Sequence, residues 1–201
     1  MKGICFIEPL FHAVVKGSKT QTRRIMPKQP RQSFYGFIEF SRKGIWRRMY
    51  DFVCGTSVVP RYQVDEVLYL KEPYYLANYQ GGFMGLEPKK AVKYKYGTRN
   101  ENFEWQWKNK LFMPEKYARY FIKITAVRCE RLQDISVYDC EREGVFSHYE
   151  RGESFVSWKN RVDASVYDCR RKAFANIIDK VQKGTWESNP YVWVYDFELV
   201  K

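Results

Sequence analysis

Short apolar runs and stretches of alternating apolar and polar residues recur along the chain, and both patterns predict β-strands. The predicted strands cover residues 3–7, 67–72, 91–96, 119–132 and 191–200. The stretch at 119–132 is the longest of them. Pro73 ends the strand at 67–72, because proline has no N–H to donate to a neighbouring strand.

Three stretches that carry capping signals predict helices. The first opens at Glu8, just before a proline, and ends where Gly17 supplies a C-terminal cap. The second begins at Ser136, the first residue of an S-x-x-D box, and ends at Gly144. The third and longest covers residues 162–183.

Strands mixed with short helices, without regular β–α–β alternation, indicate a single α+β domain over residues 1–201. The strand at the end of the chain suggests a core closed into a small β-barrel, and an open sheet is the alternative. A predicted hairpin makes residues 27–60 an insertion. Residues 76–115, rich in glycine and polar side chains, form a second, irregular insertion.

The charge of the chain indicates a class of partner. The net charge is +12, and 18% of the residues are aromatic. An excess of positive charge favours polyanionic partners, and aromatic rings beside cations favour nucleic acid because bases stack on them. Most of these rings are nevertheless expected to build the core, since 45% of the residues are apolar.

The rarer residue types exclude several other classes. The five cysteines are scattered without a C-x-x-C pair, and there are only two histidines. This usage argues against a disulfide framework, a metal site or a metal cofactor, and favours a reducing compartment. No apolar run is long enough to span a membrane, and the first residues lack the pattern of a signal peptide. We therefore expect a cytoplasmic protein with no cofactor and no membrane partner.

The stretch GSKTQTRR at 17–24 is the most distinctive motif. Taken alone it is either a solvated basic turn or the edge of a pocket. Gly17, Lys19, Thr22 and Arg24 fit the G-x-K-x-x-T-x-R pattern of the ASCH domain family, whose fold resembles the PUA domain. Further similarity to the longer bacterial and prophage members lies in LYLKE, FMPEKYARYFIKIT, ERLQDIS, a Glu-Gly pair at 143–144 and NPYVWVYDFE.

This resemblance implies a PUA-like mixed β-barrel flanked by helices, with a cleft lined by the motif and by Glu72. In a binding role, Lys19 and Arg24 attract a phosphate or carbonyl oxygen, and Thr22 lines the cleft between them. Glu72 accepts a hydrogen bond from an exocyclic amine. The implied ligand is RNA, single-stranded nucleic acid or a modified nucleoside, with its base unpaired or extruded.

Further residues are candidates for the same interface. One of the aromatic residues Tyr69, Tyr74 and Trp193 is expected to stack on the base. Basic residues outside the motif are expected to follow the phosphate backbone without reading its sequence. They are Arg47 and Arg48 in the predicted hairpin and residues 170–172 in the longest helix.

The resemblance also implies a catalytic alternative, a metal-independent amidohydrolase that deacylates acetylated cytidine. Thr22 would then act as the nucleophile or position a water, and Lys19 or Glu72 would remove a proton. Glu72 as the base, with Lys19 stabilising an oxyanion, is the easier arrangement, because the pKa of a lysine lies far above neutral. Either role needs Lys19 and Thr22 to converge, which predicts a helical turn or bend at residues 20–21. The remaining possibility is a surface salt bridge between Glu72 and the motif cations.

Overall fold

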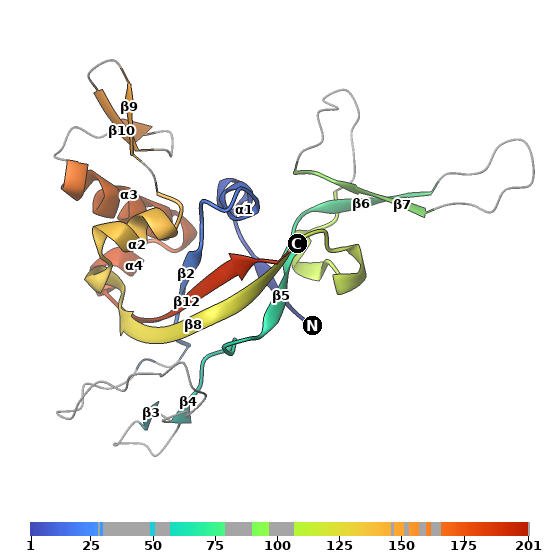
Figure 1. Ribbon diagram of the computed structural model, residues 1–201, viewed down its shortest axis with the longest axis horizontal. Coiled ribbons are helices and arrows are strands. Elements are labelled where there is room, and N and C mark those ends of the chain that lie inside the picture. The colour runs from blue at the N-terminus through green and yellow to red at the C-terminus, as the bar shows by residue number, and fades with distance from the viewer. Residues whose placement is uncertain are drawn as a thin grey trace, which may run out of the picture. The chain divides into compact units, whose positions relative to one another are not determined.

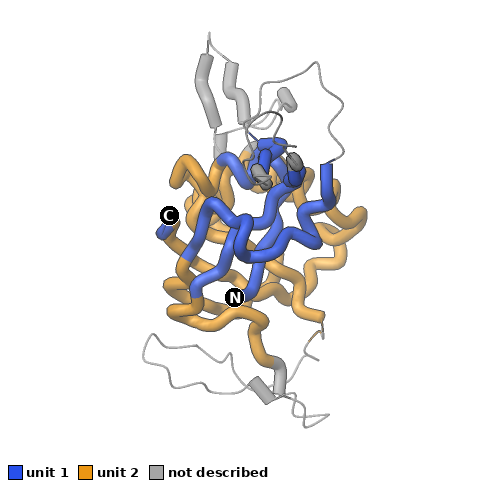
Figure 2. Tube along the Cα trace, turned by 90° about the vertical axis from the view of Figure 1, so that its right-hand side faces the viewer, with its two compact units in different colours: residues 1–12, 67–122, 200–201 blue, residues 13–66, 123–199 orange. Residues whose placement is uncertain are grey.

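The computed structural model describes residues 1–27, 29, 49–50, 57–78, 90–96, 107–145, 147–150, 153–156, 160–161 and 166–200. The chain divides into two compact units, shown in two colours in Figure 2. Unit 1 contains Met1–His12, Val67–Ile122 and Val200–Lys201, and unit 2 contains Ala13–Glu66 and Lys123–Leu199. The single domain that the sequence predicts stays a prediction.

Unit 1 is built on two parallel strands that are far apart in the sequence. Strand β1 (Lys2–Cys5) pairs with β5 (Val67–Lys71), and Ile4 lies opposite Leu70 in the register. Both of these side chains are buried. The strands predicted at 3–7 and 67–72 are therefore confirmed.

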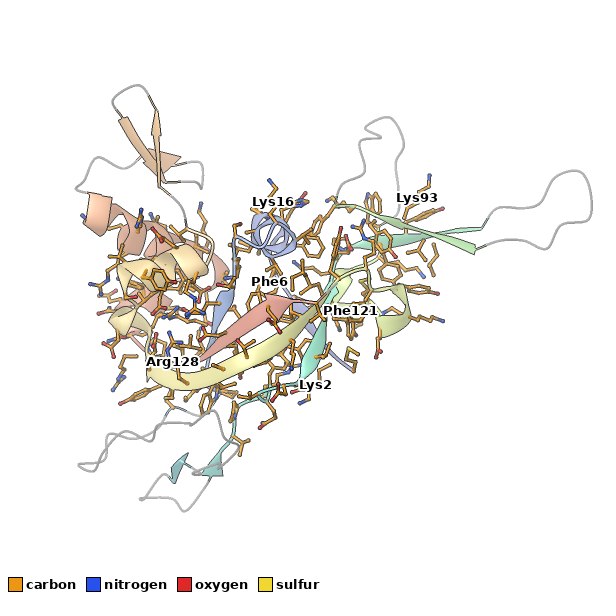
Figure 3. All side chains as sticks on the ribbon, in the orientation of Figure 1. Lys2, Phe6, Lys16, Lys93, Phe121 and Arg128 are labelled. Atoms are coloured by element: carbon orange, nitrogen blue, oxygen red, sulfur yellow. The ribbon has the colours of Figure 1, made fainter. Side chains whose placement is uncertain are left out.

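A hairpin follows directly after Pro73. Strand β6 (Tyr74–Asn78) pairs antiparallel with β7 (Lys90–Tyr94), and Tyr74 also bridges to Lys108. Lys93 extends away from β7 in Figure 3. The strand predicted at 91–96 is confirmed. The irregular insertion predicted over 76–115 stays a prediction, since residues 79–89 and 97–106 lie outside the described residues. Two 3₁₀ helices, η1 (Lys110–Phe112) and η2 (Glu115–Tyr117), come after the hairpin.

Unit 2 contains the central strands of the C-terminal half. Strand β8 (Phe121–Arg131) begins in unit 1 and continues into unit 2. Strand β12 (Tyr191–Leu199) lies between β8 and β2 (Gln21–Ile25), as Figure 1 shows, and pairs antiparallel with β2. Residues 192–197 of β12 are buried or half-buried, as expected for a strand that has a neighbour on each side. Strands β8 and β12 were predicted, whereas β2 was not.

Four helices gather at one end of β8 and β12 among the described residues. They are η3 (Leu132–Asp134), α2 (Val137–Arg142), α3 (Val166–Val181) and α4 (Thr185–Ser188). Ser136 caps α2 by accepting a hydrogen bond from the backbone N–H of Asp139 at 3.0 Å, as predicted. Helices α2 and α3 lie side by side in Figure 1.

The remaining described elements are short. Helix α1 (Glu8–Val15) begins in unit 1 and ends in unit 2. Strand β3 (Met49–Tyr50) pairs with β4 (Ser57–Val58). Strand β10 (Glu153–Val156) pairs with β9 (Ser147–Glu150) and with β11 (Asn160–Arg161). Most of the predicted hairpin insertion at 27–60 lies outside the described residues.

The chain is thus a mixed α+β protein, as predicted. Pairing among the described strands reveals no closed barrel, and the PUA-like barrel stays a prediction. Among the described residues, no helix is both long and apolar enough to cross a membrane.

Candidate functional site

The motif at 17–24 begins at the end of α1. Gly17 has a φ of 73°, in the left-handed region that glycine adopts without steric strain. The backbone N–H groups of Ser18 and Lys19 both donate to the carbonyl oxygen of Ala13, at 2.9 and 3.0 Å. These bonds close the helix, so the predicted cap at Gly17 is confirmed. Residues 18–20 lie in neither helix nor strand, and β2 starts at Gln21. The helical turn or bend predicted at residues 20–21 is therefore absent.

Lys19 is fully buried, and its ammonium group contacts the segment that follows α2. The Nζ atom donates to the carboxylate Oε2 of Glu143 at 2.5 Å and to the carbonyl oxygen of the same residue at 2.8 Å. A third acceptor, the carbonyl oxygen of Gln21, lies at 2.7 Å. An ammonium group has three protons, so these acceptors occupy its full donor capacity. Burial lowers the pKa of Lys19, whereas the charge of Glu143 acts in the opposite direction.

Arg23 is buried beside Lys19 and shares the carboxylate of Glu143. Its Nη1 donates to Glu143 Oε1 at 3.1 Å and to the side-chain oxygen of Gln21 at 2.5 Å. Its Nε and Nη2 donate to Glu130 Oε1 at 2.9 and 2.5 Å, and Nη2 also reaches Asp139 at 3.2 Å. Burial acts against the charged guanidinium, but the three surrounding carboxylates outweigh it and raise the pKa of Arg23.

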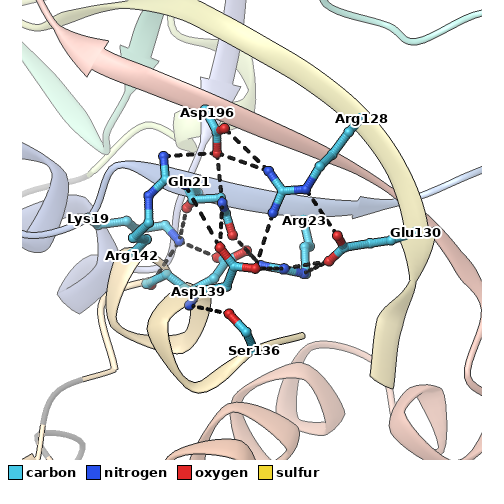
Figure 4. Close-up of polar contacts among 10 residues, drawn as sticks. Lys19, Gln21, Arg23, Arg128, Glu130, Ser136, Asp139, Arg142 and Asp196 are labelled. Carbon is cyan, nitrogen blue, oxygen red and sulfur yellow. Dashed lines mark hydrogen bonds and ion pairs between the residues drawn. The ribbon is translucent and has the colours of Figure 1, made fainter. Parts of the chain in front are cut away.

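A partly exposed layer completes this cluster, which Figure 4 shows in detail. Arg128 donates to Glu130 at 3.0 Å and to Asp139 at 3.2 Å, and Arg142 lies 3.1 Å from a carboxylate oxygen of Asp196. We call the whole cluster the α2 ion network. Its members are Lys19, Gln21, Arg23, Arg128, Glu130, Asp139, Arg142, Glu143 and Asp196.

The α2 ion network joins α2 to one face of the strands. One cation each comes from β2, from β8, from α2 and from the loop before β2, and two of the carboxylates, Asp139 and Glu143, come from α2 and the turn after it. Figure 3 shows Arg128 among the side chains that fill the region between β8 and the helices. Four cations and four carboxylates are present, so their charges cancel. Such an arrangement holds the elements in place, because separating them would leave buried charges uncompensated.

Two other motif residues, Thr22 and Arg24, lie on the opposite face of β2, because side chains alternate along a strand. Thr22 is buried and lies opposite Tyr195 of β12 in the register, and Arg24 is half-buried and lies opposite Trp193. Gln21 and Arg23 share the network face. The convergence of Lys19 with Thr22 stays a prediction.

Glu72 belongs to unit 1, where its carboxylate holds Arg119. The Oε1 atom accepts a hydrogen bond from Nε of Arg119 at 2.9 Å, and Oε2 accepts one from Nη2 at 2.6 Å. Such two-pronged pairing fixes the orientation of both planar groups. The Glu72 side chain is completely buried, and burial raises its pKa although the charge of Arg119 acts the other way.

Aromatic rings surround the Arg119 guanidinium. Its central carbon lies 4.0 Å from the ring centroid of Tyr94 and 5.2 Å from that of Tyr120. Its Nη2 also donates to the carbonyl oxygen of Tyr96 at 3.1 Å. The Arg119 side chain is 33% exposed, and Nη1 makes no hydrogen bond among the residues that the structure describes. We call Glu72, Tyr94, Tyr96, Arg119 and Tyr120 the Arg119 site.

The aromatic residues predicted to stack on a base are buried. Tyr69 donates its hydroxyl to the carbonyl oxygen of Met113 at 3.0 Å. Tyr74 packs against Tyr117 with ring centroids 5.5 Å apart, and Trp193 lies inside β12. Packing accounts for these rings, and a stacking role for any of them stays a prediction.

The predicted site residues are therefore divided between the two units. Lys19, Thr22 and Arg24 belong to unit 2, and Glu72, Tyr69 and Tyr74 belong to unit 1. Arg47 and Arg48 lie outside the described residues. No group of three or more His, Cys, Asp or Glu side chains that could hold a metal ion is present in the described part of the chain.

The sequence did not mark Arg23, Glu143 and Arg119 as site residues, although they make many of the side-chain hydrogen bonds described above. The signal for Arg23 was its position two residues from Gln21 on one strand, which β2 turns into a shared face. Arg119 offered only its position as the first residue of the longest predicted strand. Comparison with protein-family models, with curated proteins and with solved structures finds no match for this chain.

Proposed function

We propose that this protein binds single-stranded RNA or a modified nucleobase, as the resemblance to the ASCH family implies, and that Arg119 is a ligand-binding residue. One observation carries the proposal. The buried carboxylate of Glu72 holds the guanidinium of Arg119 over the ring of Tyr94, with its central carbon 4.0 Å from the ring centroid, while a third of the arginine side chain stays exposed.

This geometry suits an unpaired base or a phosphate. Nη1 of Arg119 still has protons to donate, and a phosphate or base carbonyl oxygen is a strong acceptor for them. A guanidinium plane can also stack on bases, and here the guanidinium already lies over the ring of Tyr94. The clamp by Glu72 reduces the entropy lost on binding, because the guanidinium is already oriented. The net charge of +12 supports a polyanionic ligand.

The proposal assigns different roles to the motif residues Lys19, Thr22 and Arg24. Thr22 and Arg24 remain candidate ligand contacts on their face of β2. Lys19 is assigned a positioning role instead, because its three protons already have acceptors in the α2 ion network. It would hold β2 against Glu143 and so keep Thr22 and Arg24 in place.

The amidohydrolase alternative has less support. Both of its candidate proton acceptors are engaged, Lys19 with Glu143 and Glu72 with Arg119. Incubation with an acetylated cytidine, followed by chromatography of the product, tests it directly. Deacylation that disappears in both Lys19→Ala and Glu72→Gln, with the fold retained, would favour hydrolysis over simple binding.

Fluorescence anisotropy with a labelled single-stranded oligoribonucleotide tests the binding proposal. Arg119→Gln is expected to weaken binding about ten-fold or more, as for a hydrogen bond to a charged group. Arg119→Lys should recover only part of the affinity, because it keeps the charge and loses the planar fork. Removal of one phosphate contact should also lower the salt slope by about 0.7.

A matched control comes from unit 2. Arg61 is exposed and lies 5.5 Å from the ring centroid of Tyr62, so Arg61→Gln removes the same charge from a similar arginine–tyrosine pair. Equal affinities for the wild-type chain, Arg61→Gln and Arg119→Gln, with all three folded, would refute the role of Arg119.

A further inference from the structure

Unit 1 exposes an aromatic side chain on an ordered turn. Phe112 is 79% exposed and Leu111 is 57% exposed, and both belong to η1. The side chain of Asn109 accepts a hydrogen bond from the backbone N–H of Leu111 at 2.9 Å, which caps the turn. Exposing so large an apolar ring is unfavourable for a protein that never covers it.

The turn is fastened to the strands beneath it. Met113 is buried, and its carbonyl oxygen accepts the hydroxyl of Tyr69 at 3.0 Å. The sulfur of Met113 accepts the backbone N–H of Glu72 at 3.3 Å, and Lys71 Nζ donates to the carbonyl oxygen of Leu111 at 2.8 Å. The segment that presents Phe112 therefore touches the same residue that clamps Arg119.

The segment around Phe112 is rich in lysine. Four lysines lie near it in the sequence or contact its turn: Lys71, Lys108, Lys110 and Lys116. Lys108 and Lys116 are exposed. The acid closest in sequence, Glu115, is paired with the N-terminal amino group at 2.8 Å, so it offsets little of this charge. An exposed ring among lysines complements a ligand that has flat apolar faces and negative charges.

We propose that Phe112 is a stacking position for an unpaired base of single-stranded RNA, with the phosphates lying along these lysines. The inference rests on the proposed function, since the ligand is the same, but it adds a contact outside the Arg119 site. An aromatic ring stacks on any base, so this position provides affinity without sequence preference. A duplex binds poorly here, because its bases are already stacked on one another.

Variants of Phe112 that separate a π-face from mere apolarity test the inference, with a fluorescein-labelled oligouridylate as the probe. Phe112→Ala and Phe112→Leu are each expected to weaken binding about ten-fold, and Phe112→Trp is expected to retain it. Leu111→Ala, on the same turn, is the matched control and should change affinity less than two-fold. Melting temperatures should be the same for all four variants, because these side chains are exposed.

Four outcomes would overturn the inference, and they are distinguishable from one another. Wild-type affinity in Phe112→Leu would show that apolar contact suffices. Sedimentation that shows a dimer lost in Phe112→Ala, with RNA affinity unchanged, would assign the ring to a second copy of the chain. Loss of binding in Arg119→Gln but in none of the Phe112 variants would leave the proposed function standing without this stacking position. No binding by the wild-type chain would remove both.

Discussion

Lys19 and Glu143 are 124 residues apart in the sequence, yet their side chains meet inside unit 2 with Nζ 2.5 Å from Oε2. Both are buried, and the same ammonium group also donates to the backbone of Glu143. The lysine of the sequence motif thus joins the start of β2 to the end of α2. Because its ammonium group donates to Glu143 and to the backbone of Gln21, Lys19 holds these segments in position.

Breaking this pair should strongly destabilise the fold. Lys19→Met is expected to lower the free energy of unfolding by about 3–5 kcal/mol, because it leaves the carboxylate of Glu143 buried with one cation fewer. The double variant Lys19→Met/Glu143→Gln should recover much of this loss. Denaturation by urea measures both. Lys180→Met, an exposed lysine of α3, is the control and should change stability by less than about 0.5 kcal/mol. A loss below about 1 kcal/mol for Lys19→Met would contradict the buried pairing.

Asp139 should make the fold sensitive to acid. Burial alone would raise its pKa, but the hydrogen bond from Gln21 and the nearby guanidinium groups outweigh burial and lower the pKa of Asp139. A carboxylate whose pKa is lower in the folded state contributes stability above its unfolded pKa of about 3.9, and this stability is lost as the pH falls through the folded value. Asp139→Asn should therefore be less stable than the wild type at pH 7, and the difference should shrink toward pH 3.

Urea denaturation of both proteins from pH 7 to pH 3 checks this dependence. A stability difference between wild type and Asp139→Asn that stays constant across the range would show that the carboxylate does not titrate with folding.

Arg119→Gln should strengthen a pH dependence of stability that has the opposite sign, because the pKa of Glu72 is already raised in the wild type. Without the guanidinium, only the smaller effect of His12 opposes burial, and the pKa of Glu72 should rise further than it does in the wild type. A carboxyl group whose pKa is raised on folding binds its proton more tightly in the folded state, so stability should fall as the pH rises from 5 to 7. The double variant Glu72→Gln/Arg119→Gln lacks the titrating group and should show no such fall. Equal slopes for the single and double variants would show that Arg119 does not control Glu72.

Gly17→Ala should destabilise the end of α1 through the backbone alone. The φ of Gly17 is 73°, and in the described part of the chain no atom beyond its chain neighbours lies within 4 Å of the position that a Cβ would take. The expected loss is about 1–2 kcal/mol, the cost of the left-handed conformation for a residue with a side chain. Gly17→Asn should lose less, because asparagine adopts this conformation more readily. Thermal denaturation compares them, and equal stability of the alanine variant and the wild type would contradict the observed cap.

Local signals account for the parts of the fold that were predicted correctly. Gly17 and Ser136 cap helices as expected, and β5 and β12 lie where apolar runs place them. Strand β2 was missed because its polar residues QTRR resemble a solvated turn. They form a strand because β12 pairs with them and the α2 ion network covers one face.

The sequence by itself determined the α+β class, the helix caps, the strongest strands and the positive charge, because each depends on residues close together in the chain. Only the tertiary structure decided that Lys19 meets Glu143 and that Glu72 holds Arg119. The reason is that a carboxylate attracts any nearby cation equally well. The partner is chosen by which strands and helices pack together, and no periodicity along the chain records that choice.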